Sequence, residues 1–170
     1  TYGTDFSNNI AIGYDALSAG NANFYRAIAI GRGAANKNTT NDQIAIGYEA
    51  MKVHTTGTRN IAIGNYAMGD TDAGSTSLGS TDNIFMGYNA GGGTWADVAS
   101  NYNIGIGTYV MDSALNGASN NVAMGYYALS AITTADNSIA LGTGALQELT
   151  TGASNIAIGR AAMNVHTTGG

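Results

Sequence analysis

A motif of the form aliphatic–small–aliphatic–glycine recurs nine times along this chain of 170 residues. The copies begin at Ile10, Ile28, Ile44, Ile61, Ile84, Ile104, Val122, Ile139 and Ile156. Successive starts lie 16 to 23 residues apart, and 17 is the commonest spacing. Self-similarity at a nearly fixed period is the signature of a stacked repeat architecture, in which each unit contacts only its neighbours. Such stacks serve as scaffolds and binding surfaces more often than as catalysts.

Each position of the motif forms a column with its own residue preference. The first column is Ile except at Val122, and the second is Ala except at Phe85 and Gly105. The third is Ile, Met or Leu, and the fourth is always Gly. Ala stands three residues after this Gly in every copy but one, which has Val110, and Leu or Met usually follows. Asn precedes most copies.

These columns predict the path of one repeat unit. A β-branched pattern of period two, as in Ile-Ala-Ile, favours a short strand. The Gly column suits a sharp corner, because Gly turns without a side-chain penalty. We expect a second short strand after the corner, as at 14–17, and a return turn through Thr, Asn and Gly. The sequence therefore predicts an all-β fold, a parallel β-solenoid or β-roll of about nine short coils.

The sizes of the residues suggest which face of the strand points inward. The two aliphatic columns are large enough to fill the coil together with the Leu/Met column, which leaves the small column facing outward. A small side chain suits the close approach of another surface, so we expect this column to form a subunit interface at a threefold axis. An alternative is that it packs against the chain's own connectors. The expected interface residues are Ala11, Ala29, Ala45, Ala62, Phe85, Gly105, Ala123, Ala140 and Ala157. Phe85 followed one coil later by Gly105 suggests a bulky side chain offset by a neighbouring vacancy.

Composition narrows the classes of partner. The chain has no Cys and no Pro, and it carries 25 Gly, 10% charged residues and a net charge of −5. Nucleic acid and anionic membranes are therefore poor partners, and no disulfide is expected. No apolar run is long enough to cross a membrane. We expect one repeat domain over 1–170. Because 165–169 copies 53–57, we also expect a fragment of a longer fibrous protein.

The repeated units, such as Asn60-Ile61-Ala62-Ile63-Gly64 after Thr55-Thr56-Gly57, resemble two families of fibre repeats. They are similar to the head repeats of trimeric autotransporter adhesins and to repeats in phage tail fibres. The resemblance covers nearly the whole chain. It implies a left-handed parallel β-roll associated as a homotrimer. It also implies an extracellular location, in a bacterial cell-surface fibre or in the tail fibre of a virion.

Motifs for catalysis or metal binding are weak. His54 and His166 occupy equivalent connector positions in distant repeats, so a solvated loop residue is the expectation for each. The segment 70–74 hints at a calcium loop but lacks the remaining spaced acids. No Ser is arranged with His and an acid, and no Gly-rich segment opens a helix. We expect no enzyme activity, no catalytic residue, no metal and no cofactor.

Two features could carry recognition of a ligand. Tyrosines recur in one column after the Gly corner, where they could grip a glycan or simply seal the stack. Two long connectors, 69–83 and 91–103, interrupt the rhythm, and the second contains the only Trp. Inserted loops on repeat stacks often bind partners, although this Trp could also fold back over a coil edge. The candidate ligand-binding residues are Trp95, Thr94, Asp97, Tyr88 and Tyr126.

We therefore expect a non-enzymatic fibre module that mediates surface attachment or receptor recognition. Its partners would be copies of itself and a cell-surface glycan or protein. The alternative is a purely structural spacer that holds a distal tip at a distance. Recurring Thr pairs raise an ice-binding solenoid as a third candidate, but their spacing is too irregular for a regular array.

Overall fold

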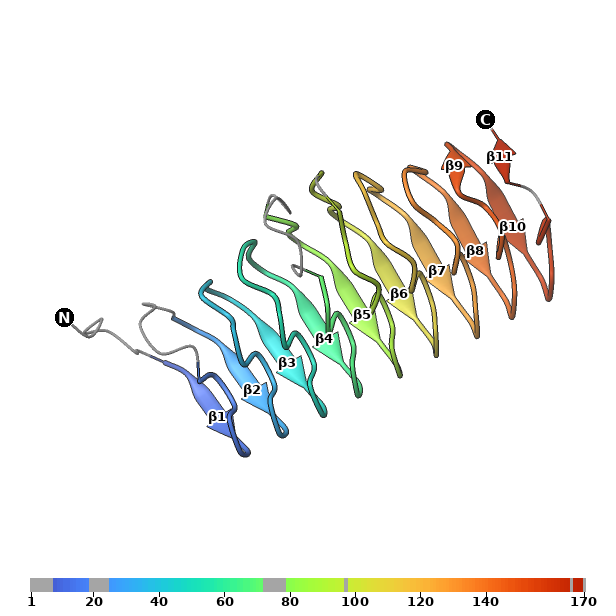
Figure 1. The fold of residues 1–170 in the computed structure, drawn as a ribbon. Helices are drawn as coiled ribbons and strands as arrows, with labels where there is room; N and C mark the ends of the chain where they lie inside the picture. The colour runs from blue at the N-terminus through green and yellow to red at the C-terminus, as the bar shows by residue number, and fades with distance from the viewer. Residues whose placement is uncertain (1–7, 19–24, 72–78, 97, 166, 170) are drawn as a thin grey trace.

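The computed structural model of the chain describes residues 8–18, 25–71, 79–96, 98–165 and 167–169. Over these residues the fold is an all-β parallel solenoid of about eight turns, without a helix. The coils stack in one line, and the two termini lie at opposite ends of the stack (Figure 1). The predicted solenoid is confirmed.

The aliphatic–small–aliphatic motif forms the strands of one long sheet. Its nine strands are β1 (Ile10–Ile12), β2 (Ile28–Ile30), β3 (Ile44–Ile46), β4 (Ile61–Ile63), β5 (Ile84–Met86), β6 (Ile104–Ile106), β7 (Val122–Met124), β8 (Ile139–Leu141) and β10 (Ile156–Ile158). All neighbours pair in parallel, and each residue lies beside its equivalent in the next coil, as Ile46 does beside Ile63. A small second sheet near the C-terminus pairs β9 (Thr151–Gly152) with β11 (Thr168–Gly169).

Wherever another coil follows, the Gly column stacks too closely to admit a side chain; only the last corner, at Gly159, has open space beside it. Gly125 has a φ of 139°, and its amide donates to the carbonyl of Ile106 in the preceding coil. A Cβ on Gly125 would lie 2.6 Å from the carbonyl oxygen of Gly142, which is closer than real Cβ contacts come. Both the left-handed backbone and the missing space therefore require Gly at this corner.

The second strand that we expected after each corner does not form. The residues there are turns, and left-handed backbone recurs at the second and fourth positions after the Gly, as at Tyr66 and Met68. This alternation bends the chain instead of extending it. Consecutive turns still bond to each other, because the amide of Met68 donates to the carbonyl of Ala90 in the next coil.

The small column points into the coil, and our expected orientation of the strands was wrong. Ala62 is fully buried, whereas Ile61 and Ile63 on either side of it are only partly covered. The coil is narrow because Ala67 and Met68 face the strand from the opposite wall and belong to the same core cluster. Except in the coil of Phe85, only a small side chain fits between these two walls, so the large aliphatic columns lie on the outer face.

The residues proposed as a subunit interface therefore lie inside a single chain. The enclosed members are Ala29, Ala45, Ala62, Phe85, Gly105, Ala123, Ala140 and Ala157. Ala11 is exposed in the first coil. An enclosed side chain cannot contact a second copy, so this column is not the interface.

Phe85 fits the small column because its neighbours leave room for the ring. It pairs with Gly105 in the next strand, and a Cβ on Gly105 would lie 2.6 Å from the ring. Gly91 also lies against the ring, and the Trp95 ring meets Phe85 edge-on at 5.7 Å between centroids. The predicted offset between Phe85 and Gly105 is confirmed, although it occurs inside the coil.

Asparagines that precede the strands form an internal ladder. The side-chain amide of Asn103 donates to Oδ1 of Asn83 at 3.1 Å and to the carbonyl of Ala118 at 2.8 Å. Oδ1 of Asn103 accepts from the backbone and side-chain amides of Asn121, both at 3.1 Å. The same pattern links Asn60 to Asn83. From Asn60 to Asn121 the ladder thus joins each strand to the next and to the connector opposite. Among the described residues, no buried side-chain nitrogen or oxygen lacks a hydrogen-bond partner.

Replacing Ala62 by Val tests the orientation of the strands. Two extra methyl groups in the enclosed column should lower the free energy of unfolding by about 1–3 kcal/mol, because the core has no room for them. The matched change Ile63→Val on the outer face should cost less. Chemical denaturation of both variants measures the difference, and a larger loss for Ile63→Val would contradict the orientation.

Replacing Asn103 by Leu tests the ladder. The change keeps the size of the side chain but leaves the amide of Asn121 and the carbonyl of Ala118 without their partner. Each buried group left unpaired should cost about 1–3 kcal/mol. Asn103→Ser is the control, because Ser138 holds the same column and its hydroxyl accepts from the amide of Asn155. Equal melting temperatures for the two variants would argue against the ladder.

Candidate functional site

Tyrosines form a continuous row on the outer surface beside the Gly corners. Tyr48, Tyr88 and Tyr126 come directly after a corner Gly, whereas Tyr66 and Tyr109 come one residue later in alternate coils. The left-handed backbone at this second position brings the ring of Tyr66 or Tyr109 to the same row as its neighbours. The first set is visible in the sequence as a column, whereas its interleaving with the second set is not.

The rings of this tyrosine row contact one another along five coils. Centroid distances are 5.2 Å from Tyr48 to Tyr66, 5.9 Å from Tyr66 to Tyr88 and 5.4 Å from Tyr88 to Tyr109, all edge-to-face. The row ends at Tyr127, whose ring stacks on Tyr109 at 5.0 Å. These spacings lie in the range that favours aromatic pairs, so the row is a packed surface feature.

Arg32 extends the row toward the N-terminal coil. Its guanidinium lies 5.9 Å from the ring centroid of Tyr14 and 5.7 Å from that of Tyr48. Among the described residues, no carboxylate pairs with Arg32. The two rings therefore hold an exposed cation at this end of the row.

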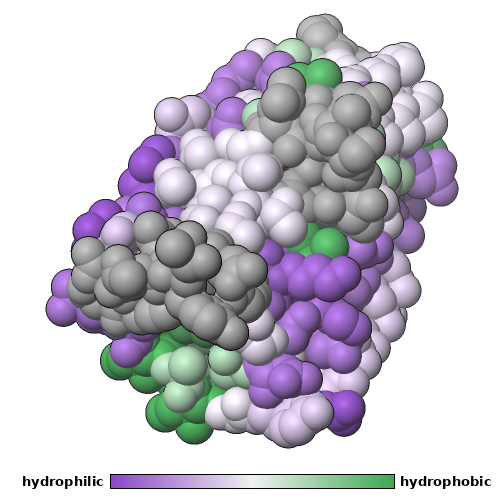
Figure 2. All heavy atoms as spheres, turned by 60° about the vertical axis from the view of Figure 1, so that its left-hand side comes forward, coloured by the Kyte–Doolittle hydropathy of each residue, from purple (hydrophilic) through white to green (hydrophobic). Residues whose placement is uncertain are grey.

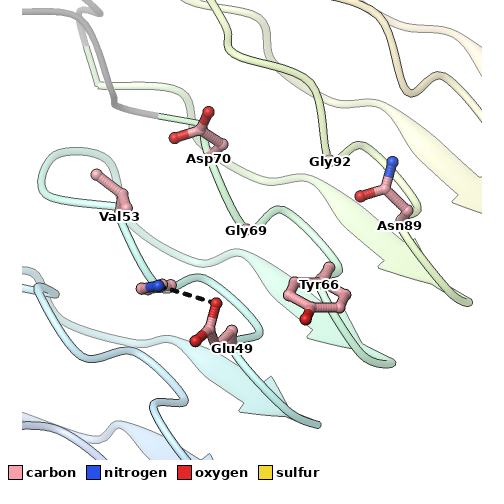
Figure 3. Close-up of a pocket in the computed structure, with 8 residues that line it drawn as sticks. Glu49, Val53, Tyr66, Gly69, Asp70, Asn89 and Gly92 are labelled. Atoms are coloured by element: carbon pink, nitrogen blue, oxygen red, sulfur yellow. Dashed lines mark hydrogen bonds and ion pairs between the residues drawn. The ribbon is translucent and has the colours of Figure 1, made fainter.

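A hollow of about 290 Å³ adjoins the tyrosine row (Figure 3). Its lining comes from three successive coils and comprises Glu49, Lys52, Val53, Tyr66, Gly69, Asp70, Asn89 and Gly92. Figure 3 shows Tyr66 and the side chain of Asp70 on the coil of β4, with Asn89 on the next coil. The hollow therefore combines an aromatic wall with carboxylate and amide groups.

An ion pair between Lys52 and Glu49 keeps both of these groups charged in the hollow. Lys52 Nζ lies 2.9 Å from a carboxylate oxygen of Glu49. The Lys52 ammonium holds the pKa of Glu49 below its usual range, and Glu49 raises the pKa of Lys52. A hydrogen bond with Glu49 also raises the pKa of Tyr48. Glu49 is therefore a carboxylate at neutral pH, and it offsets the charge of Lys52.

The long connectors do not present an exposed aromatic. Trp95 is 1% exposed, and its indole N–H donates to the carbonyl of Gly91 at 3.1 Å. The proposed role of Trp95 as a surface ligand residue was wrong, since the ring folds back over the edge of Phe85. Thr94 is exposed, and its hydroxyl donates to Asp70 at 2.7 Å. Asp97 and much of the connector 69–83 lie outside the described residues.

Tyr88 and Tyr126 are the two sequence-predicted candidates that lie in the row, and both are exposed. The structure does not bring them together with Trp95. The candidate ligand-binding residues predicted from the sequence did not include Tyr66 or the polar lining of the hollow. The signal for Tyr66 was its position one residue beyond the tyrosine column.

His54 is buried, contrary to the expectation of a solvated loop residue. The amide nitrogen of Asn60 lies 3.1 Å from Nε2 of His54 and can only donate, so Nε2 accepts. Nδ1 then carries the proton and donates to the hydroxyl of Thr71 at 2.8 Å. His166 lies outside the described residues. Across the part of the chain that the structure describes, no three His, Cys, Asp or Glu side chains gather as metal ligands would.

No protein-family model, curated protein sequence or solved structure matches the chain. Within the described residues, no helix is long and apolar enough to cross a membrane. The tyrosine row and its hollow are thus interpreted from their own geometry.

The tyrosine row should make the stack sensitive to alkali. Loss of water contact raises the pKa of Tyr109 and of Tyr127 above the ordinary value of 10.0, and neighbouring tyrosines add to the shift. The stability linked to a raised pKa is fully present below about pH 10 and is lost as the pH rises through the shifted value. Tyr109→Phe with Tyr127→Phe should therefore lose less stability on going to high pH. Denaturation at neutral and alkaline pH measures this, and an equal loss in both proteins would contradict it.

Proposed function

We propose that this chain is a non-enzymatic module of a homotrimeric extracellular fibre that mediates surface attachment or receptor recognition. The observation that carries the proposal is the outer face of the long sheet. Two aliphatic columns run along it through every coil, one on each side of the enclosed small column. The chain itself leaves these columns partly uncovered, and a contiguous apolar stripe of this kind is typical of an interaction surface.

The exposure is largest at the ends of the stack. In β1, Ile10 and Ile12 are 48% and 59% exposed, and Ile156 and Ile158 in β10 are exposed as well. Figure 2 turns the N-terminal end of the stack toward the viewer, and hydrophobic residues gather there along one lower edge. The rest of the visible surface is mostly hydrophilic or intermediate.

A second and third copy of this chain are the partners that fit such a face. The face is linear and repeats with the coil, so copies aligned side by side would match it column for column. Closed symmetry lets every copy turn the same face toward a common axis. The resemblance to trimeric fibre repeats supports three copies and a left-handed coil, and both remain predictions. The interface that we first assigned to the small column moves in this proposal to the large columns beside it.

Light scattering tests the assembly. The wild-type chain should have three times the mass of the 17.2 kDa chain. Ile63→Lys with Ile106→Lys places charges in the middle of the outer face and should reduce the mass to that of one chain. Glu148→Lys changes the charge at an exposed site elsewhere and should keep the trimer. A wild-type monomer, or a double Lys variant that keeps the full mass, would contradict the proposal.

A purely structural spacer is the second candidate. The observation that favours it is the enclosure of Trp95, which removes the aromatic anchor expected on a binding loop. A spacer needs the stack and its assembly but no ligand. The two functions are separated by whether the trimer binds anything along its side.

A further inference from the structure

We propose that the tyrosine row and its hollow bind a linear, neutral glycan chain that lies along the stack. This inference rests on the proposed attachment function and names its ligand class. The row is the longest aromatic surface on the described part of the chain. Tyr66, Tyr88 and Tyr126 are 36%, 44% and 50% exposed, and none of them belongs to the core of the coil.

The stack itself has no need for Tyr at these positions. Tyr66, Tyr109 and Tyr127 have φ values of 60°, 54° and 55°. Left-handed backbone disfavours a bulky side chain and suits Gly or Asn. In other coils the same column holds Gly33, Asn89 and Gly144. A strained aromatic that fills no part of the core points to a role at the surface.

Sugar rings fit this surface in shape and chemistry. The apolar face of a pyranose packs against an aromatic ring, while a Tyr hydroxyl bonds the sugar hydroxyls at the rim. Coils repeat at roughly 4.8 Å, so successive rings are spaced at about the length of one pyranose unit. A linear chain laid along the row would therefore place one sugar near each ring.

The hollow selects for a neutral sugar. Its volume of about 290 Å³ lies near the lower end of small-molecule pockets, which suits one sugar unit. The carboxylates of Glu49 and Asp70 and the amide of Asn89 can bond hydroxyl groups. In the hollow Lys52 is already neutralised by Glu49 and Asp70 adds a further carboxylate, so an anionic sugar meets no unpaired cation there.

The glycan site is tested by titrating the intact chain with neutral oligosaccharides and monitoring binding by NMR. Cello-, manno- and chito-oligosaccharides from disaccharide to hexasaccharide are the probes, and sialyllactose is the anionic comparison. At least one neutral series should bind more tightly as its length increases, and sialyllactose should not compete. Failure of all three series to bind, or tighter binding of sialyllactose, would overturn the neutral-glycan assignment.

Variants that carry residues found at the equivalent positions of other coils test the location of the glycan site. Tyr66→Asn with Tyr88→Thr uses the residues that Asn89 and Thr108 already place in these columns, so the fold should be kept. This variant should bind at least about tenfold more weakly, since two ring contacts are lost. Tyr102→Thr is the control, because Tyr102 is 58% exposed but lies in a different column. Equal weakening by both variants, or wild-type affinity in the first, would overturn the site.

Light scattering on the same samples separates this inference from the proposed function. A trimer that binds no probe contradicts the glycan site but leaves a spacer. A glycan-binding monomer contradicts the fibre assembly but keeps the site. If Tyr66→Asn with Tyr88→Thr changes the mass of the particle, the row is a contact between copies, and the glycan site is wrong.

Discussion

The close stacking of one coil on the next, without room for a side chain at the Gly corner, is the constraint on which the rest of the structure depends. It holds each residue beside its equivalent in the neighbouring coil, as Phe85 lies beside Gly105. Columns then become continuous physical features. The small column becomes a core, the aliphatic columns an uncovered face, and the tyrosines a row. The Asn ladder reinforces the register from within, because each amide bonds the equivalent amide in the next coil.

The sequence was sufficient to predict the stack, its strands and the Gly corner, because these depend on period and on backbone preference. Which face points inward was not predictable from size alone. Our interpretation placed Ile61 and Ile63 in the coil, but its interior is too narrow for two large walls. The facing turn already supplies Met68, so Ala62 is what fits. The width of the coil follows from the left-handed residues of that turn. No motif in the sequence predicts this left-handed backbone.

For the candidate site, too, one part could be predicted from the sequence and another part could not. The tyrosine column was visible in the sequence, but the contribution of Tyr66 depends on backbone that turns two successive positions to one surface. Trp95 was misplaced because a lone Trp in a long connector suggests exposure. In the structure, the glycines around it let the chain fold back, and Phe85 gives the indole an aromatic edge to pack against. The proposed binding site therefore moves from the irregular loop to the regular row.

Disulfide formation between equivalent positions tests the register most directly, because the natural chain contains no Cys. Ile46 and Ile63 are register partners on the outer face. Ile46→Cys with Ile63→Cys should oxidise to one intrachain disulfide without loss of the fold, as mass spectrometry of the unreduced chain would show. Ile46→Cys with Ile61→Cys is offset by two residues, which places the two Cα atoms too far apart for a bond. Free thiols in the first pair, or a disulfide in the second, would contradict the stacking on which the whole account depends.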